Sequence, residues 1–274
     1  MLGRNAKIEI CLMGLLDFLK LPESKNIQNL DAPETTLLHR KIIQSKPFLR
    51  KLYLDFYKTF LQEVPSLAQK TCIELGSGGG FLKEVFPSVI TSDVLRLPDV
   101  DQCFSGLAMP FKDESVDAFF MIDVFHHVPD SELFLKELER CLRPEGKIVM
   151  IEPANTLWGR FIYQNFHHEA FDPTSNWKLE GSGPLSSANG ALPYIVFKRD
   201  LLRFNSSFPK LKLIRIFSHT PLRYLLSGGV SLKQLLPSFM YDLVCGIEWL
   251  LQPLAPFSGM FYTVIITKVR TPRI

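Results

Sequence analysis

The sequence predicts an α/β protein built on a doubly wound, mostly parallel sheet. Between residues 70 and 155, short apolar runs alternate with helical or irregular stretches, as in a parallel sheet with crossover helices. The first run ends in an acid and opens into glycines, from Cys72 to Gly80, and the second ends at Asp93. The strands are expected near residues 71–75, 89–93, 117–122 and 147–152.

The glycine-rich turn predicts a ligand site. Glycine lets a backbone turn sharply after a strand and approach a ligand with no Cβ in the way. Gly76, Gly78 and Gly80 alternate, with Glu74 two residues ahead of the first, whereas the dinucleotide fingerprint reads G-x-G-x-x-G. Asp93 stands about where a doubly wound fold places an acid for ribose hydroxyls. Two acids and a glycine turn predict a nucleoside pocket.

Four ordered motifs carry a family resemblance. E-L-G-S-G-G-G (74–80) resembles motif I of the class I S-adenosylmethionine-dependent methyltransferases, of the small-molecule type. A-M-P-F-K-D-E-S-V-D (108–117) resembles the family's "LPF-x-D-x-SFD", and M-I-D-V-F-H-H-V-P-D (121–130) resembles its "VLHHVPD". R-P-E-G (143–146) resembles the "LRPGG" turn into the fifth strand. The alternative, an accidental glycine loop, does not explain this order.

The resemblance implies a seven-stranded Rossmann-like sheet and S-adenosyl-L-methionine as cofactor. It implies that Gly76, Ser77 and Gly78 meet the methionine part of the cofactor and that Glu74 supports the turn or the amino group. Asp93 would accept the ribose hydroxyls, or would instead only cap a strand-end turn. The expected cofactor-binding set is completed by Gly80 and Asp123.

The chain departs from the family on the adenine side. Where the family commonly has Asp-Ala before the "LPF" stretch, this chain has Ser105-Gly106. A serine hydroxyl can accept a hydrogen bond, but without the carboxylate's charge. We therefore expect adenine recognition to depend more on backbone groups and on packing by Met109.

Residues 1–66 are expected to form an N-terminal helical lid, and residues 67–274 the methyltransferase domain. Proline and apolar spacing predict helices on either side of Pro47. This segment either closes over the site or packs on the sheet. A helix is also expected from about Asp130 to Leu142, with a cap at its start and Pro144 after its end.

Two substrate-side insertions are expected, at about residues 153–198 and 220–258. The first shows no regular period and is dense in reactive groups. A short helix (199–204) and a strand (211–217) separate it from the second, and a last strand (261–269) follows. The second insertion holds an apolar helical stretch, for which core packing is favoured over lining an apolar pocket.

Histidines are the candidate proton acceptors, because imidazole titrates nearest neutral pH. His126 and His127 are expected to be structural, whereas His167 and His168 lie where this fold commonly builds its acceptor site and are the predicted catalytic residues. No metal set is expected, because His-His-Glu-x-x-Asp lacks the helical histidine spacing of zinc proteases.

Composition narrows the function. A net charge of +3 is too small and dispersed for a nucleic-acid footprint, and the five cysteines form no C-x-x-C pair. The chain also lacks an N-P-P-Y type motif and a catalytic Pro-Cys pair. No stretch reads as a signal peptide or a membrane span. These features indicate a cytoplasmic protein, with peripheral membrane contact through residues 1–20 and the apolar insertion as a further hypothesis.

The predicted function is methyl transfer from S-adenosyl-L-methionine to an oxygen or nitrogen of a small-molecule or lipid-like acceptor. The alternative is a non-catalytic protein that keeps the nucleoside pocket as a scaffold or sensor.

Overall fold

A computed structural model describes residues 18–181 and 183–270, and these residues form a seven-stranded sheet in the order β3-β2-β1-β4-β5-β7-β6. Strands β1 to β5 pair in parallel, and β7 is antiparallel to both of its neighbours. The strands are β1 Cys72–Leu75, β2 Ile90–Asp93, β3 Gln102–Cys103, β4 Val116–Ile122, β5 Leu142–Pro153, β6 Leu211–His219 and β7 Phe261–Lys268. The predicted fold class, a mostly parallel seven-stranded α/β sheet, is confirmed.

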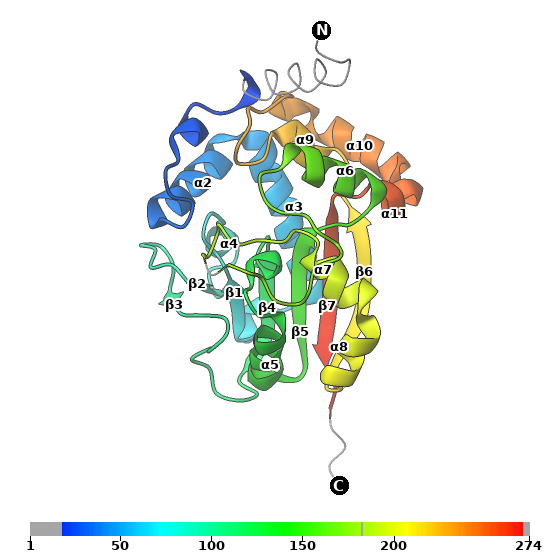
Figure 1. Ribbon diagram of the computed structural model, residues 1–274. Helices are drawn as coiled ribbons and strands as arrows, with labels where there is room; N and C mark the ends of the chain where they lie inside the picture. Colours follow the sequence, from blue (N-terminus) through cyan, green and yellow to red (C-terminus); the bar gives the residue numbers. More distant parts are fainter. Residues whose placement is uncertain (1–17, 182, 271–274) are drawn as a thin grey trace.

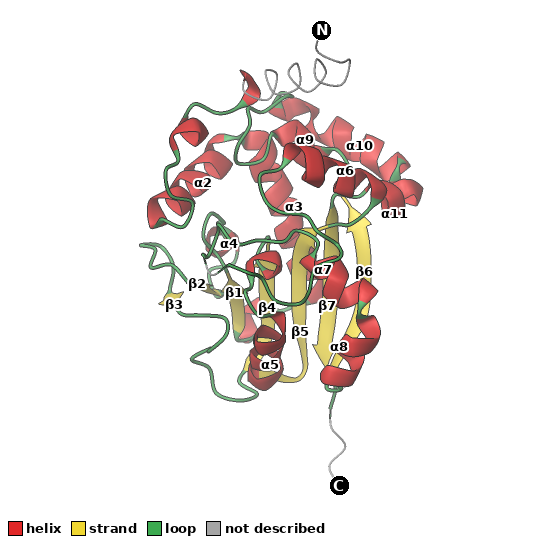
Figure 2. Ribbon diagram, in the orientation of Figure 1, coloured by secondary structure: helices red, strands yellow, loops and turns green. Residues whose placement is uncertain are grey.

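Helices cover both faces and one end of this sheet (Figure 2). The α-helices are α2 Pro33–Ser45, α3 Pro47–Glu63, α4 Leu82–Val85, α5 Ser131–Cys141, α6 Leu157–Phe166, α7 Leu192–Tyr194, α8 Leu201–Ser207, α9 Arg223–Ser227, α10 Tyr241–Leu250 and α11 Ala255–Ser258. Short 3-10 helices are η1 Glu23–Asn26, η2 Leu67–Gln69, η3 Phe125–His127, η5 Ser238–Met240 and η6 Gln252–Leu254, and the segment η4 Ile195–Arg199 is a π-helix.

The strand order reverses at β1. The chain builds outward from β1 to β2 and β3, then returns to place β4 on the other side of β1. In open parallel sheets a crevice forms at such a switch point, beyond the carboxyl ends of the strands. Helices α2, α6 and α9 lie at this end (Figure 1). The topology therefore fixes the place of the site.

Neighbouring phenylalanines of β4 show that this strand is buried on both faces. Phe119 and Phe120 are both fully buried, and successive side chains of a strand point to opposite faces. The ring of Phe120 stacks on Phe60 of α3, with centroids 4.7 Å apart, and Phe119 contacts Phe111 before the strand. Helix α5 is capped at its start by Asp130, which accepts from the backbone N–H groups of Glu132 and Leu133.

The N-terminal helices begin and end as predicted. Proline occupies the first position of both α2 and α3, where its missing N–H costs nothing. Helix α3 ends at Glu63, two residues before Pro65. It buries Phe48, Leu49, Leu52, Phe56, Tyr57 and Phe60.

The segment after β5 is more regular than the sequence indicates. Helix α6 occupies Leu157–Phe166, where no helix was expected. The side chain of Thr156 caps it by accepting from the N–H of Gly159 at 2.9 Å. Ile162 and Tyr163 are buried, but Phe161 on the outer side is half exposed. Because apolar residues lie on both sides of the helix, the sequence shows no helical periodicity of apolar residues here.

The apolar stretch of the second insertion is mostly not core, contrary to expectation. Tyr241 and Val244 are buried, but the other large apolar side chains of the stretch are exposed. They are Phe239, Leu243, Ile247, Trp249 and Leu250. Such a short helix, apolar on all sides, cannot bury every side against one neighbour.

Smaller differences concern boundaries. The short edge strand β3 had no strong apolar signal, and β5 already pairs at Leu142 before the irregular turn 143–146. Helix α8 begins at Leu201 rather than Arg199, because the π-helix precedes it.

Across residues 18–181 and 183–270, no helix is both long enough and apolar enough to span a membrane. The hypothesis of a membrane-binding segment at residues 1–20 falls almost entirely outside the described residues.

Candidate active site

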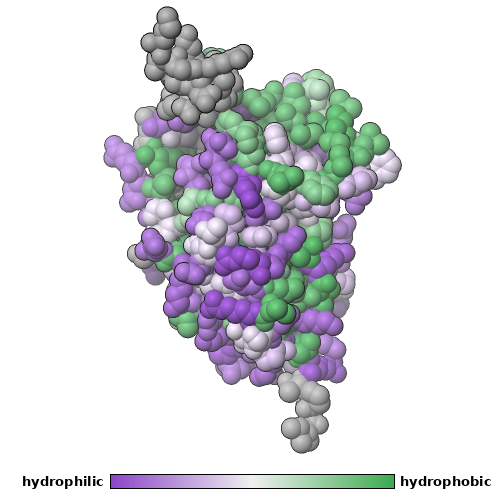
Figure 3. Space-filling model, turned by 45° about the vertical axis from the view of Figure 1, so that its right-hand side comes forward, coloured by the Kyte–Doolittle hydropathy of each residue, from purple (hydrophilic) through white to green (hydrophobic). Residues whose placement is uncertain are grey.

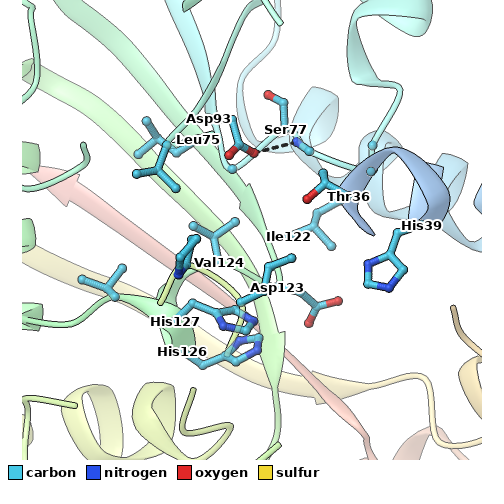
Figure 4. Close-up of a pocket in the computed structure, with 18 of the residues that line it drawn as sticks. Thr36, His39, Leu75, Ser77, Asp93, Ile122, Asp123, Val124, His126 and His127 are labelled. Carbon is cyan, nitrogen blue, oxygen red and sulfur yellow. Dashed lines mark hydrogen bonds between the residues drawn. The ribbon is translucent and has the colours of Figure 1, made fainter. Parts of the chain in front are cut away.

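A cavity of about 400 Å³ lies at the carboxyl ends of β1, β2 and β4. This volume is in the range of sites for small molecules and cofactors. Its lining comes from the ends of β1, β2 and β4, from α2, from the loop around Gly183, and from α6 and α9. Figure 4 shows side chains of α2, of the turn after β1 and of the ends of β2 and β4 around this cavity.

The glycine turn leaves no room for side chains. Gly76 has a φ of +62°, and a Cβ there would lie 2.5 Å from Val124 Cγ2. A Cβ on Gly78 would lie 2.9 Å from Thr36 Cγ2 and 3.2 Å from Asp93 Oδ2. Ser77 ties the turn down, since its N–H donates to the carbonyl of Ser92 at 2.9 Å. The turn is therefore held tightly against β2 and α2.

Glu74 is a buried carboxyl group with an unused acceptor. Its Oε2 has no hydrogen-bond partner among the described residues, and it lines the cavity. Burial raises the pKa of Glu74 to about 8. A cationic group in the cavity would satisfy this oxygen and favour its ionised form.

Asp93 at the end of β2 performs a structural role and also lines the cavity. Its Oδ2 accepts from the N–H of Gly78 at 3.0 Å (Figure 4), and its Oδ1 accepts from the N–H of Leu95 at 2.8 Å. Burial raises its pKa. Asp93 therefore does cap the turn at the end of β2. Its contact with the ribose stays a prediction.

The adenine-side residues divide into two groups. Ser105, Gly106 and Leu107 line the cavity, but Met109 does not. Met109 is buried in the core, where its N–H donates to Glu137 Oε2 at 2.7 Å. The expected packing of Met109 against adenine is therefore not supported, because the turn at Ser105–Ala108 directs Leu107 toward the cavity instead.

Asp123 follows β4 and faces the cavity from the opposite side of the glycine turn (Figure 4). Its backbone has a φ of +55°, which is uncommon outside glycine, asparagine and aspartate. Burial raises the pKa of its carboxyl group to about 8. Its position fits the cofactor role implied by the resemblance.

Two residues of α2, Thr36 and His39, contribute to the cavity but were not predicted. Thr36 Oγ1 is buried and has no hydrogen-bond partner within the described ranges, and burial lowers the pKa of His39. With Ile43 they stand three and four positions apart, so helical spacing alone places them on one face. That spacing was the available signal.

Asp31 connects the segment before α2 to the glycine-rich loop around Gly183. Its Oδ1 accepts from the N–H groups of Leu185 and Ser186, both at 2.8 Å, and its Oδ2 accepts from Ser186 Oγ at 2.6 Å. Gly183, Pro184 and Leu185 line the cavity. The segment before α2 and this glycine-rich loop therefore close the cavity together.

The predicted catalytic histidines lie in the cavity beside a second pair. His167 Nδ1 and His168 Nε2 are each 3.7 Å from a carboxylate oxygen of Glu169. His126 Nε2 is 3.3 Å and His127 Nε2 is 3.6 Å from the same carboxylate. Burial lowers the pKa values of His127 and His167 to about 4.

Glu152 at the end of β5 was missed by sequence reasoning. It is fully buried and accepts from the backbone N–H groups of Val124, just before η3, and of Phe125 and His126 in η3, at 2.9, 2.7 and 3.4 Å. It also pairs with His126 Nδ1 at 2.7 Å. Its only sequence signal was its place as an acid at the end of an apolar strand, which is also the place of Glu74.

Comparison with known proteins agrees with this geometry. Residues 73–150 match the sequence profile of a family described as a methyltransferase domain. A demethylmenaquinone methyltransferase from Streptomyces griseus is 31% identical over 72 residues, 26% of this chain and 31% of that protein. An uncharacterized methyltransferase from Schizosaccharomyces pombe is 36% identical over 99 residues, 30% of this chain and 38% of that protein.

The chain thus spans less than two fifths of the length of these two relatives. Among solved structures, a geranyl diphosphate C-methyltransferase from Streptomyces coelicolor shares 15% identity. The alignment covers 84% of each chain, with a TM-score of 0.48.

The matched segment contains the glycine turn, Asp93, Asp123 and the histidines of η3. The fold and this segment agree with the resemblance to the class I S-adenosylmethionine-dependent methyltransferases. Residues 73–150 match the methyltransferase-domain family, so the resemblance read from the motifs is confirmed.

Proposed function

We propose that this protein transfers a methyl group from S-adenosyl-L-methionine to an oxygen or nitrogen of a small-molecule or lipid-like acceptor. One observation carries the proposal: the glycine turn, Glu74, Asp93 and Asp123, all within the matched segment, meet in one cavity. The finer assignment of the acceptor rests on the rest of that cavity.

The cavity residues fit the cofactor. Glu74 Oε2 and Thr36 Oγ1 are buried and unpaired within the described residues, so they can receive an ammonium group and a polar group. The glycines of the turn bring backbone atoms rather than side chains to the cavity wall. The methionine part of the cofactor would be held by Glu74, Gly76, Ser77, Gly78 and Gly80. Asp93 would hold the ribose. The adenine would lie against Ser105, Gly106 and Leu107. When bound, the cofactor supplies an electrophilic methyl group.

The chain's own task is then to position the acceptor and to take its proton. Tyr163, Tyr224 and Phe261 give the far side of the cavity aromatic walls, and the imidazoles of His167 and His168 lie beside them. His167 packs edge-on against Tyr163, with centroids 5.6 Å apart. We assign the proton acceptor to His167 or His168, as the sequence predicts.

The second insertion links this cavity to an apolar surface. Tyr224 and Val230 line the cavity, while large apolar side chains of the same insertion face solvent (Figure 3). Trp249 is 74% exposed and Phe239 is 80% exposed, and aromatic residues of this kind are favoured at lipid–water interfaces. This observation favours an acceptor with a lipid-like body, presented at a membrane surface.

Methyl turnover with labelled S-adenosyl-L-methionine tests the activity. The purified full chain is incubated with the label and with separated polar and lipid fractions of a cell extract, and Asp93→Ala protein serves as the control. Label entering a product only with the unchanged protein supports the proposal, and the fraction that holds it reports the acceptor class. Cofactor binding by calorimetry without transfer to any fraction would favour the scaffold alternative. Absence of both binding and transfer would overturn the proposal.

A separate measurement tests the lipid surface. The full chain is floated with vesicles of neutral and of anionic phospholipid, next to a Phe239→Ser, Trp249→Ser variant. The unchanged protein should float and the variant should stay behind. Equal behaviour of the two proteins would remove the membrane from the proposal and leave methyl transfer intact.

A further inference from the structure

Two buried or half-buried histidines and a glutamate converge on one point of the cavity wall. His126 and His127 come from η3, and Glu169 comes from the segment after α6. The nearest ligand atoms of the three residues all lie within 4.8 Å of one another. His167 and His168 flank Glu169 from the same segment.

The hydrogen bonds of the two imidazoles determine which nitrogen faces this point. His127 Nδ1 lies 3.1 Å from the carbonyl oxygen of Ser187, which can only accept, so Nδ1 carries the proton. His126 Nδ1 lies 2.7 Å from Glu152 Oε2, and Glu152 already accepts backbone N–H groups as a carboxylate does. Both imidazoles therefore direct Nε2 toward Glu169.

When both imidazoles are neutral, their Nε2 lone pairs and the Glu169 carboxylate place three electron-pair donors together, with no hydrogen-bond donor among them. Such a set is unfavourable in a buried site unless a cation occupies it. A proton on His126 would satisfy one contact, that with Glu169 at 3.3 Å. A metal ion would satisfy all three at once.

The spacing fits a metal of zinc size. Nitrogen and oxygen ligands about 2.0–2.1 Å from a tetrahedral ion lie roughly 3.3–3.4 Å from each other. Glu169 Oε2 lies 3.3 Å from His126 Nε2, and Glu169 Oε1 lies 3.6 Å from His127 Nε2, both close to this spacing. Histidine ligands of metals usually donate their other ring N–H to a carboxylate or a backbone carbonyl, and Glu152 and Ser187 supply one of each.

We propose that His126 Nε2, His127 Nε2 and the Glu169 carboxylate form a site for a divalent transition metal, with Zn²⁺ as the ion that this ligand set suits best. Two histidines, one carboxylate and an open position toward the cavity match the ligand count of catalytic rather than structural zinc sites. The open position would take water or an oxygen of the acceptor and ease loss of its proton.

The sequence does not predict this site, because its two halves are 42 positions apart, from His127 to Glu169. Neither half has the spacing of a known metal motif. The site also does not depend on methyl transfer, so its test reads metal binding directly.

The test uses the full chain, stripped of metal with a chelator, with ZnCl₂ as the probe and calorimetry as the readout. One equivalent of Zn²⁺ should bind, and Co²⁺ in its place should give visible absorption of a site with nitrogen ligands. Glu169→Gln, which keeps the shape, and His127→Ala should each raise the Kd for Zn²⁺ roughly a hundredfold or more. His39→Ala, an imidazole of the same cavity outside the three ligands, should leave the Kd within about twofold of the unchanged protein.

Circular dichroism of each variant establishes that it is folded before its binding is measured. Failure of the folded, unchanged protein to bind one equivalent would overturn the proposal. Binding that Glu169→Gln retains at equal affinity would overturn it too, since the ion would then sit elsewhere. In either case the three groups would be held together by a proton on His126.

Discussion

Ser186 donates its hydroxyl hydrogen to Asp31 across 155 positions of the chain, and this contact joins the segment before the first lid helix to the glycine-rich loop. The loop's own N–H groups at Leu185 and Ser186 donate to the same carboxylate. A single side chain thus holds two distant parts of the cavity roof together.

Asp31→Ala should therefore loosen the roof without unfolding the protein. Asp31 is only partly buried and is not among the core residues, so little of the core depends on it, while three hydrogen bonds to the loop are lost. We expect the Kd for S-adenosyl-L-methionine, measured by calorimetry, to rise about three- to tenfold. Asp172→Ala is the matched control, because the Asp172 carboxylate accepts its hydrogen bonds from Thr174 in its own loop. Equal Kd values of the two variants for S-adenosyl-L-methionine would show that the Asp31 contact does not affect cofactor binding.

Asp93→Asn should weaken cofactor binding by roughly 1.5 to 3 kcal/mol, the usual cost of removing a charged hydrogen-bonding partner. Asp93→Ala should in addition lower the free energy of unfolding by about 1 to 3 kcal/mol, because Gly78 and Leu95 lose their acceptor. Calorimetry and urea denaturation measure the two effects. Asp101→Asn, a nearby acid outside this cavity, is the control, and an unchanged affinity in Asp93→Asn would move the ribose contact elsewhere.

Glu74→Gln should make the ligand-free protein more stable at high pH. The ordinary pKa of this side chain is 4.5, and burial raises it to about 8 in the folded state. The folded protein thus holds a proton that the unfolded chain releases, so the stability contribution of Glu74 falls as pH rises between these values. Relative to the unchanged protein, the variant should gain roughly 1 to 3 kcal/mol at pH 8 and little at pH 4.5.

Denaturation curves at both pH values measure this gain. A constant difference between the two proteins across the range would show that Glu74 does not titrate as its burial implies. Cofactor binding should weaken in the same variant, because the charged partner of the ammonium group is lost.

Met109→Ala should destabilise the protein and leave cofactor affinity unchanged. Met109 is buried in the core, and truncation of a buried methionine to alanine costs about 2 to 5 kcal/mol. Leu107→Ala is the matched opposite, since Leu107 lines the cavity and is less buried. It should weaken cofactor binding at a smaller stability cost. Thermal unfolding measures the stability of the two variants, and calorimetry measures their cofactor affinity. Weaker cofactor binding in Met109→Ala than in Leu107→Ala would show that Met109 contacts adenine after all.

Replacing the catalytic histidine by alanine should lower turnover roughly a hundredfold while cofactor binding persists. His167 and His168 serve as each other's control, because they are adjacent and both lie near Glu169. We expect one substitution to have this effect and the other to change turnover much less. Full turnover in both variants would leave the acceptor activated by position, or by the groups around His126.

The parts of the site that sequence predicts are those whose residues are close together along the chain. Glu74, the glycines and Asp93 lie within twenty positions, and strand and turn geometry brings them to one edge of the sheet. Their arrangement is local, so the motif contains it. The same holds for the parallel strands, whose apolar runs are bounded by turns.

The roof and the acceptor side could be predicted only in part, with His167 and His168 placed correctly in the cavity. Thr36 and Glu169 line the cavity, and Glu152 lies behind its wall, where it pairs with His126. The three residues come from distant parts of the chain, and only tertiary packing brings them together. Helix α6 was missed because apolar residues cover both of its sides. Met109 was misplaced because a single turn decides whether it or Leu107 faces the cavity.

The hold of Asp31 on both parts of the roof has a kinetic consequence. In the proposed function, cofactor and acceptor share the cavity under this roof, so both products would leave when the roof opens. In enzymes closed in this way, product release often limits the turnover number. The first catalytic cycle should then run faster than those that follow, and rapid mixing should show a burst of product about equal to the amount of enzyme.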